Sequence, residues 1–205
     1  RKQPHFDNFT LGTFSFGTLK DLRVVADFGR TATDMAFRLN GQWHRGNHYR
    51  NDKMGNDLAI NPALLWRPNE RSNVRLNLEY VRADNKPDSG LPFDDGRLAA
   101  VPRTRSYQSP FDDSRQDIYR FRLDAETRLG DRVLLRNKAF YTGLDWLSNG
   151  TLLGSVVTEL DSVVTELDSV VVDTSKTFQR WLTKLDDGQK LLGNQLEALV
   201  EFRHG

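Results

Sequence analysis

The sequence contains no cysteine, and its charges almost cancel, with 29 Lys and Arg residues against 28 Asp and Glu residues. Without cysteine there is no disulfide framework, no thiolate metal site and no cysteine nucleophile. A formal net charge of +1 creates no long-range field that would gather nucleic acid. We therefore expect no nucleic-acid partner.

Long hydrophobic runs are also missing. No stretch approaches the roughly 18 consecutive apolar residues of a membrane-spanning helix, and the first five residues lack the apolar core of a signal peptide. The chain is therefore either soluble or crosses a membrane as β-strands. It also lacks an initiator Met, which suggests a processed chain or an excised piece.

The clearest positive signal is alternation of apolar and polar residues with a period of two, which places them on opposite faces of a sheet. In 73–80, for example, Val74, Leu76 and Leu78 alternate with polar residues. The pattern predicts about nine strands, at 8–16, 21–28, 34–44, 56–67, 73–80, 118–129, 133–147, 176–186 and 195–203. Pro62 cannot donate a ladder hydrogen bond, so we expect a bulge or a sheet edge there.

The connections between these segments alternate between short and long. This alternation predicts an up-and-down antiparallel sheet with tight turns at one end and long loops at the other, as in outer-membrane β-barrels. The short connections are 29–33, 68–72, 130–132 and 187–194, and the long ones are 46–55, 84–115 and 148–175. Residues 17–20 form an additional short link.

Strand length and aromatic placement favour an all-β transmembrane barrel over a soluble β-sandwich. Several segments reach the 9–11 residues of a tilted membrane strand, whereas sandwich strands usually have five or six. Aromatic residues lie near the proposed strand ends, where an interfacial girdle needs them: Trp43, Trp66, Tyr80, Tyr119, Tyr141 and Trp146. The predicted lipid face carries Leu22, Val24, Phe28, Met35, Phe37, Leu39, Leu76, Leu78, Leu196, Val200 and Phe202.

A second interpretation stays open at this point. In a soluble β-sandwich or small β-barrel that acts as a ligand-binding module, the same apolar residues would form an interior core. Solubility without detergent would favour that alternative.

Residues 155–161 are repeated without change at 162–168. A period of seven is odd, so in a strand each copy exchanges faces, whereas in a helix the Val and Leu residues form one stripe. Periodicity favours a helix, and the Val and Thr content favours strands. We interpret the repeat as a tandem duplication within a loop or hairpin extension over 148–175, inside a single domain at 1–205.

No catalytic or metal-binding constellation is present in the sequence. His44 and His48 have the spacing of a helical metal pair but lack the accompanying glutamate. Asp84, Asp88 and Gly90 resemble the start of a calcium loop without its remaining ligands. Since no arrangement of nucleophile and base is recognisable, we expect neither enzyme activity, nor a metal site, nor a cofactor.

The long connection 84–115 is the most distinctive region, because binding residues concentrate in long loops on rigid scaffolds. Arg103, Arg105 and Tyr107 would suit an anionic, aromatic ligand through charge-assisted hydrogen bonds and stacking. The alternative is that they are ordinary solvated loop residues.

Several stretches taken together resemble the early barrel strands of TonB-dependent outer-membrane receptors, especially ferric-siderophore receptors. The similarity covers most of 1–147 and resumes near 176–203. It is carried by Lys2 to Pro4, Gly12 to Thr18, Arg23 to Phe28, Ala36 to Gly41, Pro62 to Trp66, Leu76 to Tyr80, Pro87 to Pro92 and Val101 to Arg103. Gly90-Leu-Pro92 and Val101-Pro-Arg103 look most like receptors for catecholate-type siderophores.

The resemblance implies a 22-stranded barrel in the bacterial outer membrane, filled by an N-terminal plug. Such a barrel binds a ferric siderophore at its outer face and imports it with energy passed through TonB. This sequence departs from that pattern because plug, TonB box and a final aromatic strand are absent. An odd strand count ending at the loop side would also prevent closure as a single-chain barrel.

Overall fold

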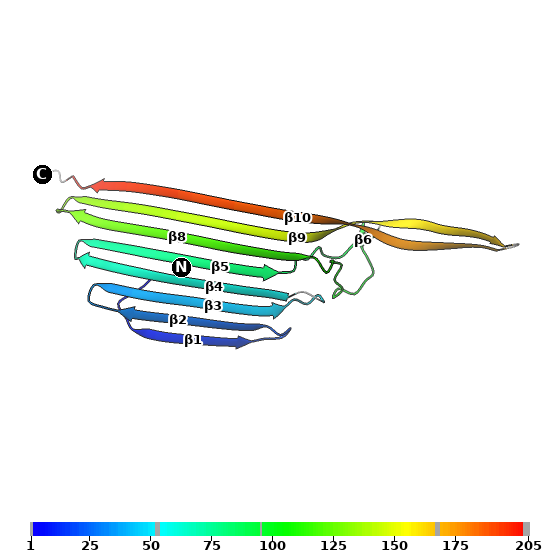
Figure 1. Cartoon of the computed structure of the whole chain (residues 1–205), viewed down its shortest axis with the longest axis horizontal. Coiled ribbons are helices and arrows are strands. Elements are labelled where there is room, and N and C mark those ends of the chain that lie inside the picture. Colours follow the sequence, from blue (N-terminus) through cyan, green and yellow to red (C-terminus); the bar gives the residue numbers. More distant parts are fainter. Residues whose placement is uncertain (1, 52–53, 95, 167–168, 203–205) are drawn as a thin grey trace.

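In the residues that it describes, the computed structural model consists of one long antiparallel sheet and one small separate hairpin, with no second layer over the long sheet (Figure 1). It describes residues 2–51, 54–94, 96–166 and 169–202. Eight strands follow one another in chain order within the sheet: β1 (Phe9–Phe16), β2 (Leu22–Thr31), β3 (Met35–Asn47), β4 (Met54–Asn69), β5 (Ser72–Asn85), β8 (Asp113–Leu129), β9 (Val133–Glu166) and β10 (Ser169–Val200). Two short strands, β6 (Phe93–Asp94) and β7 (Arg97–Leu98), form a separate hairpin. This confirms the all-β, up-and-down antiparallel prediction.

The connections lie at the two ends of the sheet as expected. The β2–β3, β4–β5 and β8–β9 connections are tight turns at what we call the turn end (Figure 1). Gly130 begins the last of these with a positive φ of 63°, a conformation that glycine adopts without steric cost. The β3–β4 and β5–β8 connections and the β9–β10 hairpin lie at the opposite, loop end.

The prediction of about nine strands is wrong at the C-terminal end of the chain. Residues 187–194 do not turn but pair continuously with β9, for instance Gly188 with Asp145, so that 176–186 and 195–200 belong to the single strand β10. The turn signal at Asp186-Asp187-Gly188 is overridden because β9 is long enough to offer a partner to every residue there. The sheet therefore has eight strands, and β10 ends at the turn end, where β1 begins.

In its described part, the segment 148–175, expected as a loop or a hairpin extension, forms a hairpin extension. Apart from 167–168, these residues lie in β9 and β10, which continue as a paired hairpin well beyond the end of β8. We call the part beyond Thr151 and Leu182 the hairpin extension. It contains the seven-residue repeat, which is extended and not helical in its described part.

Cross-strand register divides the side chains into an apolar and a polar face. Directly opposed residues of an antiparallel pair share a face. One row contains the directly paired Phe28, Leu39 and Pro62, and it continues in register, across a gap in the β4–β5 pairing beside Pro62, with the directly paired Leu78, Phe121, Tyr141 and Leu192. The predicted apolar set is confirmed on this face, except for Phe202, which follows β10.

The apolar band slants across the sheet. On the apolar face of β2, Phe28 is the apolar side chain nearest to the turn end. The row of residues that contains Phe28 reaches β10 at Leu192. In β10 the apolar residues continue beyond this row to Val200. The shift amounts to roughly one residue per strand, which is what strands tilted by about 35–45° to a barrel axis produce. The slope fits a band of constant height that crosses tilted strands.

Two tryptophans of the apolar face mark its limits on neighbouring strands. Trp43, paired with Leu58, donates its indole N–H to Asn56 Oδ1 at 2.8 Å, and Trp66 donates to Asp34 Oδ2 at 3.0 Å. From Leu58 to Trp66 the strand rises by about 26 Å. Amphipathic rings with polar partners at such a spacing suit the two girdles of a membrane barrel. Trp146 is a correction, because it lies on the polar face and donates to Ser114 Oγ at 3.1 Å.

Ion pairs cover the polar face. Asp27, of which 3% is exposed, accepts two hydrogen bonds from the Arg38 guanidinium at 2.7 and 2.9 Å. Further pairs on this face join Arg120 to Glu79, Arg122 to Asp124 and Arg136 to Glu126, at 2.7 to 2.9 Å. Such a face is suited to water or to a polar partner rather than to lipid.

The N-terminal residues run over this polar face. Lys2 Nζ lies 2.7 Å from Asp27 Oδ2, and Arg38 donates to the Gln3 carbonyl at 2.9 Å. The Arg67 guanidinium stacks 4.8 Å from the Phe6 ring centroid. The segment before β1 is thereby attached to the polar face of β2, β3 and β4.

The soluble alternative does not fit this architecture. The chain exposes 14763 Å², whereas a compact protein of 23.5 kDa exposes about 9,800 Å². Among the described residues, the buried apolar side chains are only Ala36, Ala63, Leu65, Tyr107 and the two prolines Pro4 and Pro92. Because the sheet has no second layer, the apolar face is not the interior of a sandwich. None of the described segments is a helix of the length and hydrophobicity that membrane crossing requires.

Pro62 interrupts the ladder as its chemistry requires, although β4 is not at an edge. It pairs with Leu39 of β3, but towards β5 the ladder runs from Ile60 directly to Ala63. The register is the same on both sides of the gap, so the expected bulge or edge is wrong, and the missing N–H is accommodated by a gap in the pairing on one side.

Candidate functional site

Three segments meet at the loop end of the sheet. They are the β3–β4 connection, the β5–β8 connection with its β6–β7 hairpin, and the start of the hairpin extension (Figure 1). Connections of this length carry binding residues only if they are held in place. Two clusters of hydrogen bonds provide that support.

Arg50 forms the first cluster. Its side chain is only 9% exposed, and Nε lies 2.7 Å from Asp88 Oδ2. Nη1 donates to the carbonyl oxygens of Arg103 at 3.2 Å and Arg105 at 3.4 Å. The neighbouring Asn51 N–H donates to the Thr104 carbonyl at 2.8 Å. A single guanidinium thus fixes two distant parts of the β5–β8 connection on the β3–β4 connection.

The predicted ligand residues lie on the segment that Arg50 holds. The side chains of Arg103 and Arg105 are exposed, whereas Tyr107 is buried with 8% exposure. The Arg105 guanidinium carbon lies 5.2 Å from the Tyr107 ring centroid, within the range of a cation–π contact. The structure therefore brings Arg105 and Tyr107 together, with the exposed Arg105 guanidinium over the ring of the buried Tyr107.

Asp112 and Thr151 form the second cluster, and both are about 1% exposed. Asp112 accepts from the Thr151 N–H at 2.9 Å, from the Thr151 hydroxyl at 2.7 Å and from the Ser109 hydroxyl at 2.6 Å. Ser89 donates its hydroxyl to the Thr151 carbonyl. Burial raises the pKa of Asp112, but these hydrogen bonds outweigh it and hold the pKa below its ordinary value.

This second cluster closes the ladder between β8 and β9. Their pairing ends at Asp113 and Asn149. Two residues further along β9, side chains replace the missing strand. Asp112 accepts a hydrogen bond from the Thr151 N–H, and the Ser89 hydroxyl donates one to the Thr151 carbonyl. Sequence reasoning missed both Arg50 and Asp112, since each is an ordinary polar loop residue. The one usable signal was Ser109-Pro-Phe-Asp112, a serine placed before an aspartate as in a side-chain-bonded turn.

The loop end also exposes large apolar side chains beside these clusters. Tyr49 is 56% exposed, Phe93 59% and Phe111 79%. The exposed Arg103 and Arg105 add guanidinium groups to this aromatic surface. This combination suits an anionic ligand with aromatic groups.

The His44 side chain forms contacts with two carboxylates, one just before β2 and one in β4. Its Nε2 lies 2.6 Å from Asp21 Oδ1 and its Nδ1 3.2 Å from Asp57 Oδ2, so that both ring nitrogens have carboxylate partners. His48 does not join them through any such contact in the described part of the chain. No group of three or more His, Asp or Glu residues suitable for a metal ion occurs among the described residues.

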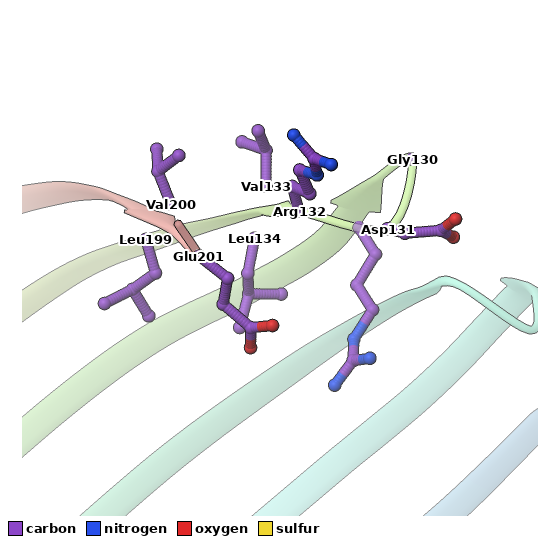
Figure 2. A pocket seen from close by; sticks show the side chains of 9 residues that line it. Gly130, Asp131, Arg132, Val133, Leu134, Leu199, Val200 and Glu201 are labelled. Carbon is purple, nitrogen blue, oxygen red and sulfur yellow. The ribbon is translucent and has the colours of Figure 1, made fainter. Parts of the chain in front are cut away.

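A hollow at the turn end is a poor binding site. It measures about 250 Å³ and surrounds the β8–β9 turn and the end of β10. Figure 2 shows Val133 and Val200 on one side of the sheet and Leu134, Leu199 and Glu201 on the other. Because its lining straddles the sheet, it does not enclose a ligand.

Comparisons with solved structures identify the architecture. The chain superimposes on the closed form of the ferric-catecholate import receptor Fiu from Escherichia coli K12 with a TM-score of 0.81 and 20% identity, covering 99% of this chain and 30% of that one. For the siderophore receptor PiuA from Acinetobacter baumannii the TM-score is 0.76 with 20% identity, covering 100% and 29%. For the ferripyoverdine receptor of the outer membrane of Pseudomonas aeruginosa it is 0.73 with 12% identity, covering 97% and 25%.

These similarities establish the fold as part of a receptor-type β-barrel. The chain spans about a third or less of the length of these receptors. No protein-family model and no curated protein sequence matches it.

Proposed function

We propose that the chain forms part of the barrel wall of a TonB-dependent receptor that takes up ferric siderophores across the bacterial outer membrane. The observation that carries this proposal is the superposition of essentially the whole chain on import receptors, at TM-scores of 0.76 to 0.83 for Fiu and PiuA. The apolar face then contacts outer-membrane lipid, the polar face lines the lumen, and the loop end faces outwards. The protein transports its ligand and does not transform it.

The ligand that suits the loop end best is a ferric siderophore of the catecholate type. Ferric catecholate complexes are anionic and aromatic, and the exposure of Arg103 and Arg105 at the loop end supports a role in binding such a complex. Arg50 and Tyr107 hold these arginines in place through the contacts at 3.2, 3.4 and 5.2 Å. Transport further requires a plug domain within the lumen and energy delivered through TonB. The polar face of the sheet is the surface on which such a plug would rest.

Ligand binding is tested with the chain refolded in detergent micelles. We expect a ferric tris-catecholate complex to quench tryptophan fluorescence. The R103A/R105A variant should weaken binding by at least roughly 100-fold, because it removes two charge-assisted hydrogen bonds of about 1.5–3 kcal/mol each. The matched control R128A/R132A removes the same charge at the turn end and should leave affinity unchanged. A ferric hydroxamate complex tests the ligand class.

Two results would refute this proposal. Equal weakening by both double variants would show that the complex responds only to overall charge. A stable, monodisperse protein in water without detergent would remove the barrel assignment itself.

A further inference from the structure

The hairpin extension has an open backbone edge. On the β8 side of β9 the last ladder pair is Asn149 with Asp113, and Asp112 and Ser89 complete the hydrogen bonds of Thr151. Beyond this point the described residues of β9, up to Glu166, pair with β10 alone. Alternate N–H and C=O groups along this edge are therefore available to another strand.

Among the strands that the structure describes, β9 contacts only β8, β10 and the short strand β6, so no second layer covers the described part of the extension. An isolated two-stranded ribbon is marginally stable in water, and a third strand is the simplest way to stabilise it. Residues 155–166 are rich in Val and Thr and contain no Pro. Such a segment has high β-propensity and accepts strand addition readily.

Charge identifies the kind of strand that fits. Residues 155–175 include five acidic residues, Glu159, Asp161, Glu166, Asp168 and Asp173, and no Lys or Arg. A second copy of the extension would bring two such acidic segments side by side, which is unfavourable. A basic segment would instead gain from opposite-charge pairs across the strands.

We propose that the β9 edge of the hairpin extension, from Leu153 to Glu166, binds a basic, extended polypeptide segment as an added β-strand. The backbone ladder supplies most of the affinity, and the acidic residues select the partner. This surface is separate from Arg103 and Arg105 and does not depend on siderophore binding. Failure of one proposal therefore leaves the other standing.

The test uses a fluorescent decapeptide of alternating Lys and Thr and the full chain in micelles. Binding is followed by fluorescence anisotropy at low and physiological salt. We expect saturable binding that weakens at least tenfold when alternate peptide amides are N-methylated, because methylation removes ladder donors without altering charge. An alternating Glu and Thr peptide should not bind.

Two protein variants locate the site. In one, Asn-Gly replaces 154–179, which joins Leu153 to Arg180 by a two-residue hairpin turn, and we expect binding to be lost. In the other, E159Q/D161N/E166Q/D173N should weaken binding at least tenfold. The control D187N/E197Q lies in the part of β10 between Leu182 and Val200, outside the hairpin extension, and should have no effect.

Several outcomes would overturn the proposal. Equal binding of the methylated peptide would mean attraction by charge alone. Equal binding to the truncated chain would place the peptide elsewhere, and absence of binding to the intact chain would remove the site. Sedimentation that shows self-association lost on truncation would assign the edge to a second copy.

Discussion

Leu78→Arg is the sharpest test of the facing of the sheet. Leu78 is 40% exposed on the apolar face, in the row with Leu39 and Phe121, between Trp43 and Trp66 in height. An arginine on the lipid face near the bilayer midplane costs about 2–4 kcal/mol. At about 1.4 kcal/mol per tenfold, this lowers the folding equilibrium constant by roughly 30- to 700-fold. We expect the variant to fold poorly into lipid vesicles.

The control for charge and size is Ala59→Arg, which places the same side chain on the polar face of β4. Ala59 pairs with Gln42 on one side and Val81 on the other, and the change should cost less than about 1 kcal/mol there, as surface substitutions usually do. Both variants are compared by urea titration of tryptophan fluorescence in vesicles. Equal loss of stability in both variants, or none in Leu78→Arg, would refute the assigned facing.

Three further predictions concern single contacts. The pKa of Asp112 is lowered in the folded protein. Its contribution to stability is therefore present above the unfolded pKa of about 3.9 and is lost as the pH falls below that value. Limited proteolysis of the β5–β8 connection should accelerate below about pH 4, and Asp112→Asn should abolish this dependence. Leu19 and Lys20 have φ values of 59° and 56°, so replacement by Asn-Gly should stabilise the chain by about 1 kcal/mol in urea titration, and no gain would mean that this turn is not left-handed. A Cβ at Gly193 would overlap the Phe140 ring, so Gly193→Val should destabilise by about 1–3 kcal/mol, and adding Phe140→Ala should recover part of that loss.

Alternation was sufficient to predict the wall of the sheet, because side chains in a strand alternate between faces and one face here is apolar. It also assigned the facing of Leu22, Phe37 and Leu78 correctly. It could not predict that β10 is one strand, since Asp186-Asp187-Gly188 has the composition of a turn. Only the presence of a long partner in β9 decides between turn and strand, and that information is not local.

The loop end was predicted less completely. The length of the 84–115 connection, together with its arginines and aromatics, indicated a binding region, and the burial of Tyr107 beneath Arg105 refines that prediction. Arg50 and Asp112 were not identified, because their roles depend on which loops the fold places next to one another. Residues of this kind become visible only in three dimensions.

The closure of the ladder at Thr151 has a consequence for how the molecule opens and how its sequence can vary. Both register shifts of the β9–β10 ladder, at Asp173/Thr174 and Phe178/Arg180, lie on the extension side of this point. From Thr151 and Leu182 to Val133 and Val200 the ladder is uninterrupted. The extension can therefore fray as a separate cooperative unit, and insertions such as the seven-residue duplication can lengthen it without moving any wall residue to the opposite face.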